Sequence, residues 1–190
     1  MDFQDQTVLV TGAAGNLGQA VARAFAQRGA KLVLVDRRRE ALERVFGADN
    51  ESQILAAVDL LDAAQVAGAV DEAVGRFGAI DVVCNIAGGF DMGPAVHETT
   101  DEMWNRLFDL NARTVLQVAR AAVPKMKERG RGRIVNVAAN AAQKGAAGMG
   151  AYCASKDVVV RMTESMAAEL REHGINVNCV MPSIIDTPEN

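Results

Sequence analysis

The most reactive pairing in the sequence is a tyrosine followed four residues later by a lysine. Tyr152 and Lys156 lie in a segment with helical character, and residues four apart share one face of a helix. An ammonium group beside a phenol favours the phenolate, so the pair predicts a phenol pKa lowered from about 10 toward neutral pH. Such a phenol can act as a general acid or base. The spacing alone is common, but Tyr152 is the only tyrosine in the chain.

A glycine-punctuated turn between a predicted strand and a predicted helix is the second chemical signal. It runs over residues 11–18, where Gly12 permits a tight turn, Gly15 lets the backbone approach a pyrophosphate and Gly18 allows close helix packing. The helix N-terminus adds amide groups and a partial positive charge for the anion. A plain turn is the alternative, but a strand before and a helix after favour a dinucleotide-binding loop. Its cofactor-binding candidates are Gly12, Ala14, Asn16, Leu17 and Gly18.

An acidic residue after this loop bears on the choice of cofactor. Asp36 ends the second predicted strand, where a carboxylate can accept from a ribose 2′-hydroxyl and repel a 2′-phosphate. NAD(H) is therefore preferred. NADP(H) stays possible because Arg37 could hold a 2′-phosphate, although a solvated helix start explains at least two of the arginines at 37–39. Asp59, followed by Leu60, ends the third strand and could meet the adenine amino group, cap the next helix, or do both.

Alternating apolar runs and helical segments supply the frame for these residues. Apolar runs closed by turns or polar residues predict strands at 7–10, 31–35, 53–58, 80–84, 133–137 and 175–180. Helices are predicted at 17–27, 40–46, 63–77, 101–128 and 151–172. This order predicts an α/β fold of the Rossmann type, a doubly wound parallel sheet covered on both faces. Tyr152 then follows the fifth strand, at the carboxyl edge where such sheets bind ligands.

Length and composition set limits on the class of protein. With 190 residues, 49% hydrophobic and 23% charged, the chain suits one domain over residues 1–190 and is too short for two. A net charge of −4 and 4% aromatic residues predict no nucleic-acid partner. No apolar run reaches the roughly 18 residues of a membrane span, and the acidic start is unlike a secretory signal, so we expect a cytoplasmic protein with no membrane partner. The three cysteines lack paired spacing, so we expect no disulfide framework and no metal site.

With these residues in view, the whole chain resembles the short-chain dehydrogenase/reductase family. The glycine loop, Tyr152 with Lys156, and Asn111 all stand where the family has its motifs. Three further segments add to the resemblance. They are Asn85-Ile86-Ala87-Gly88, similar to the family's Asn-Asn-Ala-Gly motif, residues 132–137, similar to its fifth-strand motif, and residues 182–187, similar to its Pro-Gly-x-x-x-Thr turn with Ser183 in the glycine place.

The resemblance implies a role for each matching residue. Tyr152 would transfer the proton, and Lys156 would hold the nicotinamide ribose and depress the tyrosine pKa. Asn111 would hold a water that links Lys156 to solvent, while Ile185 and Thr187 would contact the carboxamide. The other cofactor-binding positions that it implies are Asn85, Ala87, Gly88 and Pro182. It also implies a small-molecule substrate, a homodimer or homotetramer, and a seventh strand and last helix, which we expect after Asn190.

One position departs from the family pattern. The family serine that orients the substrate oxygen lies thirteen residues before the tyrosine, and that position is Ala139 here, preceded by Ala138. Loss of such a donor costs on the order of 10²–10³ in rate where the chemistry relies on it. The dihydropteridine reductase branch lacks this serine and reduces a quinonoid pterin with NADH. The chain resembles that branch locally at residues 87–90, 148–152 and 186–190, but keeps the asparagines at 85 and 111.

The leading function is therefore hydride transfer between NAD(H) and a carbonyl compound, an alcohol or a quinonoid compound. Two alternatives stay open. One is a 3-oxoacyl thioester reductase, which would usually require NADPH and the serine. The other is a dinucleotide-binding protein with weak or no catalysis, because Ala139 replaces the serine.

Overall fold

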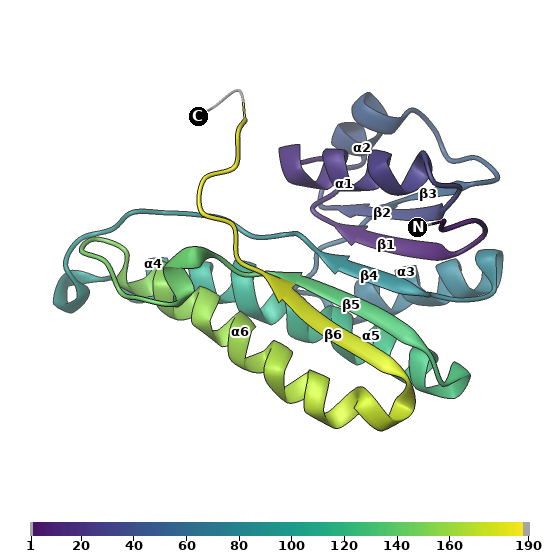
Figure 1. The fold of residues 1–190 in the computed structure, drawn as a ribbon. Helices are drawn as coiled ribbons and strands as arrows, with labels where there is room; N and C mark the ends of the chain where they lie inside the picture. Colours follow the sequence, from purple (N-terminus) through teal and green to yellow (C-terminus); the bar gives the residue numbers. More distant parts are fainter. Residues whose placement is uncertain (1, 188–190) are drawn as a thin grey trace.

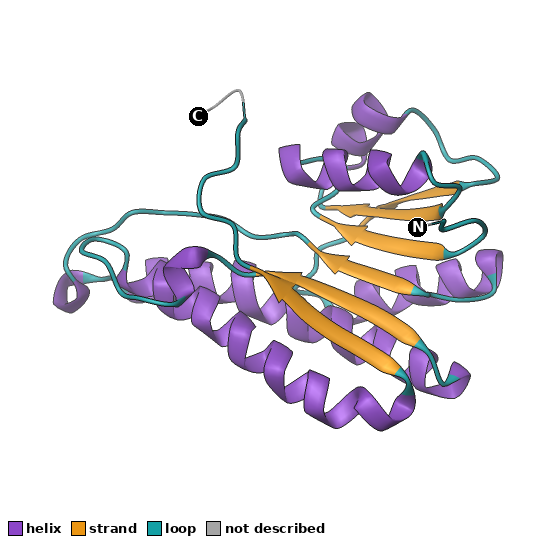
Figure 2. Cartoon of the chain, viewed as in Figure 1, coloured by secondary structure: helices purple, strands orange, loops and turns teal. Residues whose placement is uncertain are grey.

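Six parallel strands form one sheet with helices on both faces (Figures 1 and 2). The computed structural model describes residues 2–187. The strands are β1 (Thr7–Thr11), β2 (Lys31–Asp36), β3 (Gln53–Ala57), β4 (Val82–Asn85), β5 (Gly132–Val137) and β6 (Ile175–Val180). The main helices are α1 (Asn16–Ala26), α2 (Arg39–Phe46), α3 (Ala63–Phe77), α4 (Asp101–Phe108), α5 (Thr114–Arg129) and α6 (Gly150–Leu170). The predicted α/β class is confirmed.

The strand order β3-β2-β1-β4-β5-β6 places the point of reversal between β1 and β4. Strand β1 pairs with β2 on one side and with β4 on the other, with Thr11 opposite Val35 and Asn85. After β1 the chain runs toward β2, and after β4 it runs toward β5 on the other side. The loops at the carboxyl ends of β1 and β4 therefore diverge and leave a crevice. Open α/β sheets bind ligands at such a crevice.

Two apolar clusters, one on each face, hold the helices to the sheet. Alternate strand residues explain the division, because successive side chains point to opposite faces. Val8 and Val10 pack with α1 and α2 on one face, whereas Leu9 packs with α3, α5 and α6 on the other. Figure 1 shows α1 and α2 above the sheet and the other helices below it. The middle strands are therefore buried on both sides, which is why they appear in the sequence as continuous apolar runs.

The predicted single helix over 101–128 is interrupted, and this corrects the sequence-based prediction. Helix α4 ends at Phe108, a π-helical turn spans Asp109–Arg113, and α5 begins at Thr114. A π-turn inserts an extra residue into a helix and is often found at functional sites. Here it turns the buried side chain of Asn111 toward Gly89 and Ser155, with hydrogen bonds to both. These distant partners give no periodic signal in the sequence.

Two smaller differences concern element ends. The strand predicted over 80–84 is β4, Val82–Asn85, and the helix predicted over 151–172 is α6 followed by a 3₁₀ turn at Arg171–His173. The further strand and helix expected after Asn190 lie outside the described residues. Within residues 2–187, no helix has the length and apolar character needed to cross a membrane.

Candidate functional site

The loop between β1 and α1 is shaped by close backbone contacts that exclude side chains. Gly12 has φ +63°, and a Cβ there would lie 2.9 Å from the Cα and N of Ala87. A Cβ on Gly18 would collide with the carbonyl oxygen of Gly12. Oγ1 of the buried Thr11 accepts hydrogen bonds from the amides of Ile86, at 3.0 Å, and Ala87, at 3.1 Å. The loops after β1 and β4 are therefore fixed against each other.

The N-terminus of α1 is open to an anion. Its N-cap is Gly15, which provides no side-chain capping hydrogen bond. The positive end of the helix dipole favours a negatively charged group here. Together with the glycine cradle, this arrangement fits the pyrophosphate of a dinucleotide.

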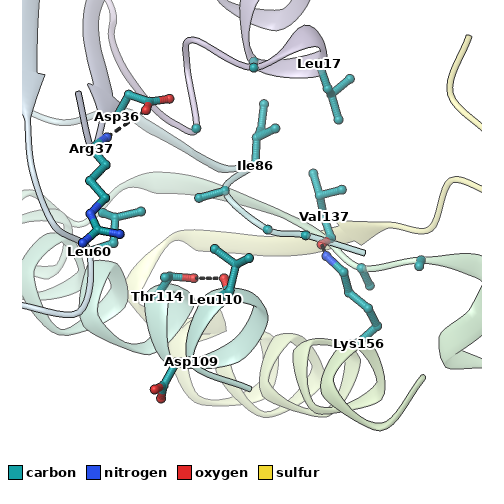
Figure 3. A pocket seen from close by; sticks show the side chains of 18 of the residues that line it. Leu17, Asp36, Arg37, Leu60, Ile86, Asp109, Leu110, Thr114, Val137 and Lys156 are labelled. Atoms are coloured by element: carbon teal, nitrogen blue, oxygen red, sulfur yellow. Dashed lines mark hydrogen bonds between the residues drawn. The ribbon is translucent and has the colours of Figure 1, made fainter. Parts of the chain in front are cut away.

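The carboxylate of Asp36 lies beside this loop, at the end of β2. Its Oδ2 accepts from the amide of Ala14 at 3.1 Å, and its Oδ1 accepts from the amide of Arg37 at 2.8 Å. The side chain of Arg37 extends from there toward Leu60 (Figure 3). Each carboxylate oxygen keeps acceptor capacity for a ribose hydroxyl.

Two further charged residues, Arg39 and Asp59, make contacts within the fold. Arg39 pairs with both Glu43 and Asp49, which agrees with a structural role for this arginine. Asp59 accepts from the amide of Leu61 at 3.0 Å. The side chain that caps α3 belongs to Asp62 instead. The capping alternative for Asp59 is therefore wrong, because the helix begins four residues later.

A cavity of about 1020 Å³ extends along the carboxyl edge of the sheet. Figure 3 shows Asp36, Arg37 and Leu60 at one end, Val137 and Lys156 at the other, and Ile86 between them. The sequence-predicted site residues that line this cavity are Gly12, Asn16, Leu17, Gly18, Asp36, Arg37, Asp59, Leu60, Ala87, Gly88, Tyr152, Lys156, Pro182 and Ile185. Residues predicted from six separate regions of the sequence are therefore brought to one cavity.

Four sequence-predicted site residues do not line it: Ala14, Asn85, Asn111 and Thr187. Ala14 instead supports Asp36. Asn85 is buried and its Nδ2 donates to Oδ1 of Asn136 at 2.8 Å, which joins β4 to β5. Its geometry supports a structural position rather than contact with a ligand.

Asn111 lies outside the cavity lining and holds together the segments that surround Tyr152. Its Oδ1 accepts from the amide of Gly89 at 2.8 Å, and its Nδ2 donates to the carbonyl of Gly89 at 3.0 Å and to Oγ of Ser155 at 2.9 Å. Oγ of Ser155 in turn donates to the carbonyl of Tyr152 at 2.8 Å. One amide therefore ties the loop after β4 to the first turn of α6.

Lys156 and Asn111 converge on Gly88. A Cβ on Gly88 would lie 3.0 Å from Nζ of Lys156 and 2.9 Å from Oδ1 of Asn111. The ammonium donates to the carbonyl of Val137 at 3.0 Å, as drawn in Figure 3. Burial lowers the pKa of Lys156 to about 8, because water cannot solvate the charged form.

Comparison with known proteins assigns the family. The sequence family described as short chain dehydrogenase matches residues 6–190. The chain belongs to the short-chain dehydrogenase family. A sorbitol dehydrogenase from Cereibacter sphaeroides is 36% identical over 187 residues, covering 98% of this chain and 73% of the relative. A galactitol 2-dehydrogenase from Agrobacterium fabrum is 36% identical over 190 residues, with the same coverage of each chain.

Solved structures of short-chain dehydrogenases agree with this assignment. An NAD⁺-bound xylitol dehydrogenase superimposes with a TM-score of 0.92 at 32% identity, covering 100% of this chain and 74% of that one. A gluconate 5-dehydrogenase from Burkholderia cenocepacia, solved with NADP and tartrate, gives 0.89 at 31% identity, covering 98% and 74%. The chain is accordingly an NAD(P)-dependent oxidoreductase of this family. Its cofactor is a nicotinamide dinucleotide.

The Tyr152 phenol differs from the sequence-based prediction. It is half-buried, and the edge of the Phe90 ring meets it with centroids 4.9 Å apart. Burial raises the pKa of Tyr152 above its ordinary value of 10, with a smaller contribution from Cys153. The lowered pKa predicted from the Tyr/Lys spacing is therefore wrong for the chain by itself. The Lys156 ammonium is hydrogen-bonded to Val137, and the loss of solvent around the phenol decides the direction.

Ala139, the position without the family serine, does lie at this site. It is 5% exposed and lines the cavity with Ala138, Tyr152 and Lys156. The wall at this point is therefore apolar. No group of three or more histidine, cysteine, aspartate or glutamate side chains within residues 2–187 could hold a metal ion.

Sequence reasoning missed several lining residues, and two sets of them include polar side chains. The first comes from one face of α4 and the π-turn: Glu102, Asn105, Arg106, Asp109 and Leu110. Their spacing of three and four residues was a readable signal for a polar helix face. The second is Ser183, which was noted only as a departure from the family turn and which also lines the cavity.

Proposed function

We propose that this short-chain dehydrogenase transfers a hydride between NAD(H) and a secondary alcohol or the corresponding ketone, with Tyr152 as the general acid and base. The observation that carries the proposal is that Tyr152 and Lys156 line the same cavity as Asp36, with Lys156 and Asp36 at opposite ends of it. A dinucleotide bound with its adenosine at Asp36 then has its nicotinamide beside the phenol. The names of the sorbitol, galactitol and xylitol dehydrogenases support a polyhydroxylated substrate.

Each side chain has a separate task in this proposal. During reduction, Oη of Tyr152 gives its proton to the substrate oxygen, and during oxidation the phenolate takes the proton back. Lys156 holds the nicotinamide ribose and stabilises the phenolate by its charge. Asn111 keeps the loop after β4 and the start of α6 in register through Gly89 and Ser155. When bound, the cofactor supplies the hydride and, in its oxidised form, a positive charge that favours the phenolate.

We propose that NAD(H) is preferred because of the charge of Asp36. A 2′-phosphate at that position would meet a carboxylate that already supports the loop through Ala14. Arg37 lies close enough to the cavity to line it. It is therefore the residue that would favour a 2′-phosphate once the Asp36 charge is removed. The homodimer or homotetramer implied by the family stays a prediction.

A second candidate is reduction of a flat quinonoid compound, and Phe90 is the observation that favours it. Phe90 is 58% exposed, and its ring meets Tyr152 edge-on. An exposed aromatic surface beside the proton donor suits a planar conjugated acceptor. In such an acceptor the negative charge spreads over a ring system, so the absent hydroxyl at Ala139 matters less.

The test is a turnover panel with a matched variant. Oxidation of sorbitol, galactitol, xylitol and meso-2,3-butanediol is followed with NAD⁺, and reduction of 2,3-butanedione and quinonoid dihydropterin is followed with NADH. Tyr152→Phe should abolish turnover and leave NADH affinity nearly unchanged, because the ring packs but no proton is available. Lys156→Ala should reduce both turnover and NADH affinity. Full activity in Tyr152→Phe would assign the proton transfer to another group.

A further inference from the structure

The pairing between β5 and β6 continues past both strands into the cavity wall. The amide of Ala138 donates to the carbonyl of Val180 at 3.0 Å, and the amide of Asn140 donates to the carbonyl of Pro182 at 2.9 Å. These bonds extend the parallel ladder of the two strands. Continuing this register places residue 139 opposite Pro182, one strand spacing away, with Ser183 the next residue along.

Among the described residues that line this cavity, Ser183 carries the only small hydroxyl without a hydrogen-bond partner. The side-chain hydroxyls in the lining belong to Thr114, Tyr152 and Ser183. Oγ1 of Thr114 donates to the carbonyl of Leu110 at 2.9 Å and is occupied within its own helix. Ser183 is exposed, and within residues 2–187 its hydroxyl has no hydrogen-bond partner.

We propose that the Ser183 hydroxyl donates a hydrogen bond to the substrate oxygen that exchanges its proton with Tyr152. This inference rests on the proposed function and adds a second substrate-contacting group to it. Negative charge develops on the carbonyl oxygen as the hydride reaches the carbon, and a placed donor stabilises that charge. Ala139, just after β5, offers no donor, so the segment just after β6 would provide it from the lining of the same cavity.

Two other polar side chains near Ala139 fit this role less well. Asn140 and Gln143 lie one and four residues after Ala139, but both are exposed and neither lines the cavity. Nε2 of Gln143 is instead directed to Sδ of Met181, 3.9 Å away. Ser183 is therefore the polar residue close in register to position 139 that lines the cavity together with Tyr152.

The experiment measures turnover and cofactor binding separately in a small set of variants. Ser183→Ala removes the hydroxyl, Ser183→Thr keeps it, and Ser183→Ala with Ala139→Ser moves it to the adjoining strand. Ile184→Ala is the matched control, because Ile184 is 84% exposed, adjoins Ser183 and does not line the cavity. The substrate is the member of the panel above that the parent turns over fastest, and NADH dissociation constants are measured by fluorescence titration.

We expect Ser183→Ala to lower kcat by on the order of 10–10², with an NADH dissociation constant within about twofold of the parent. Ser183→Thr should retain most of the activity, and Ala139→Ser should restore much of what Ser183→Ala loses. If Ser183 had a merely structural role, a hydroxyl at position 139 would not restore the activity. Ala139→Ser in the parent should gain little, because one donor is already present.

Several results would overturn the role of Ser183. They are an unchanged kcat in Ser183→Ala, an equal loss in Ile184→Ala, or no rescue by Ala139→Ser. If Tyr152→Phe is inactive while Ser183→Ala is fully active, the proposed function stands and the Ser183 inference fails. If Tyr152→Phe is active, or if the parent turns over no member of the panel, the proposed function fails and the role of Ser183 fails with it.

Discussion

Asp36 and Ala14, 22 residues apart, are joined by a hydrogen bond of 3.1 Å from the Ala14 amide to the Asp36 carboxylate. The bond fixes the end of β2 against the glycine-rich loop after β1. The same carboxylate faces the cavity at the end assigned to the adenosine. Asp36 therefore combines a structural acceptor with a negative charge, and the two contributions can be separated by substitution.

We predict that NADH binds more tightly than NADPH and that the Asp36 charge is the cause. Asp36→Asn keeps an oxygen acceptor for Ala14 but removes the charge. The ratio of the NADPH to the NADH dissociation constant should therefore fall by about tenfold or more, which is 1.4 kcal/mol or more in binding free energy. Asp36→Ala loses the acceptor as well. It should narrow or reverse the preference with help from Arg37, and should weaken both cofactors. Fluorescence titration measures the affinities of the three proteins for both cofactors, and tighter NADPH binding by the parent would refute the assignment.

The buried ammonium of Lys156 predicts a pH-dependent contribution to stability. Its pKa is about 8 in the folded protein, whereas the unfolded chain has the ordinary value of 10.5. Between these values the unfolded state binds more protons, so the free energy of unfolding contributed by this group rises with pH, by on the order of 3 kcal/mol in total. Below about pH 8 both states are charged and the contribution is constant.

Lys156→Met isolates this effect, because all other titrating groups are shared with the parent. Urea unfolding is measured at pH 7.5, 9 and 10, which span the interval over which the Lys156 contribution changes. The free energy of unfolding of the parent should rise relative to that of the variant as the pH rises. Parallel pH profiles for the two proteins would show that Lys156 titrates normally in the folded state.

A methyl group on Gly88 should disrupt the site locally. It would lie 2.9 Å from Oδ1 of Asn111 and 3.0 Å from Nζ of Lys156, so one of these groups must move. Gly88 does not have a positive φ, so alanine fits its backbone. We expect Gly88→Ala to lower kcat by about tenfold or more, as misplacement of a catalytic group does, with little change in the melting temperature. Gly68→Ala in α3 is the control, since its Cβ meets nothing within 4 Å.

Gly18 should be intolerant of alanine for a packing reason. A Cβ there would collide with the carbonyl oxygen of Gly12 and lie 2.8 Å from Cα of Ala13, so α1 must move away from β1. We expect a loss of stability of about 1–3 kcal/mol and weaker NADH binding. Gly75→Ala, in open space on α3, should instead stabilise the fold by about 0.5–1 kcal/mol. Chemical denaturation of the two variants checks the contrast, and equal effects would contradict it.

Features that depend on neighbours along the chain could be predicted from the sequence alone. The apolar runs of the strands, the glycine turn at residues 11–18 and the acidic end of β2 are local signals, because burial on both faces and backbone conformation act on consecutive residues. The shared helix face of Tyr152 and Lys156 has the same origin. These signals determined the fold class, the cofactor loop and the end of the sheet that carries the cavity.

What only the tertiary structure decided involves residues far apart in the sequence. The π-turn in the predicted helix over 101–128 accompanies hydrogen bonds from Asn111 to residues 22 and 44 positions away. The raised pKa of Tyr152 follows from burial, and the solvent that a side chain loses depends on the whole packed fold. The presence of Ala139 and Ser183 in the lining of one cavity depends on the register between β5 and β6. The sequence by itself determined which groups are available for chemistry, whereas strand register and burial decided which of them meet.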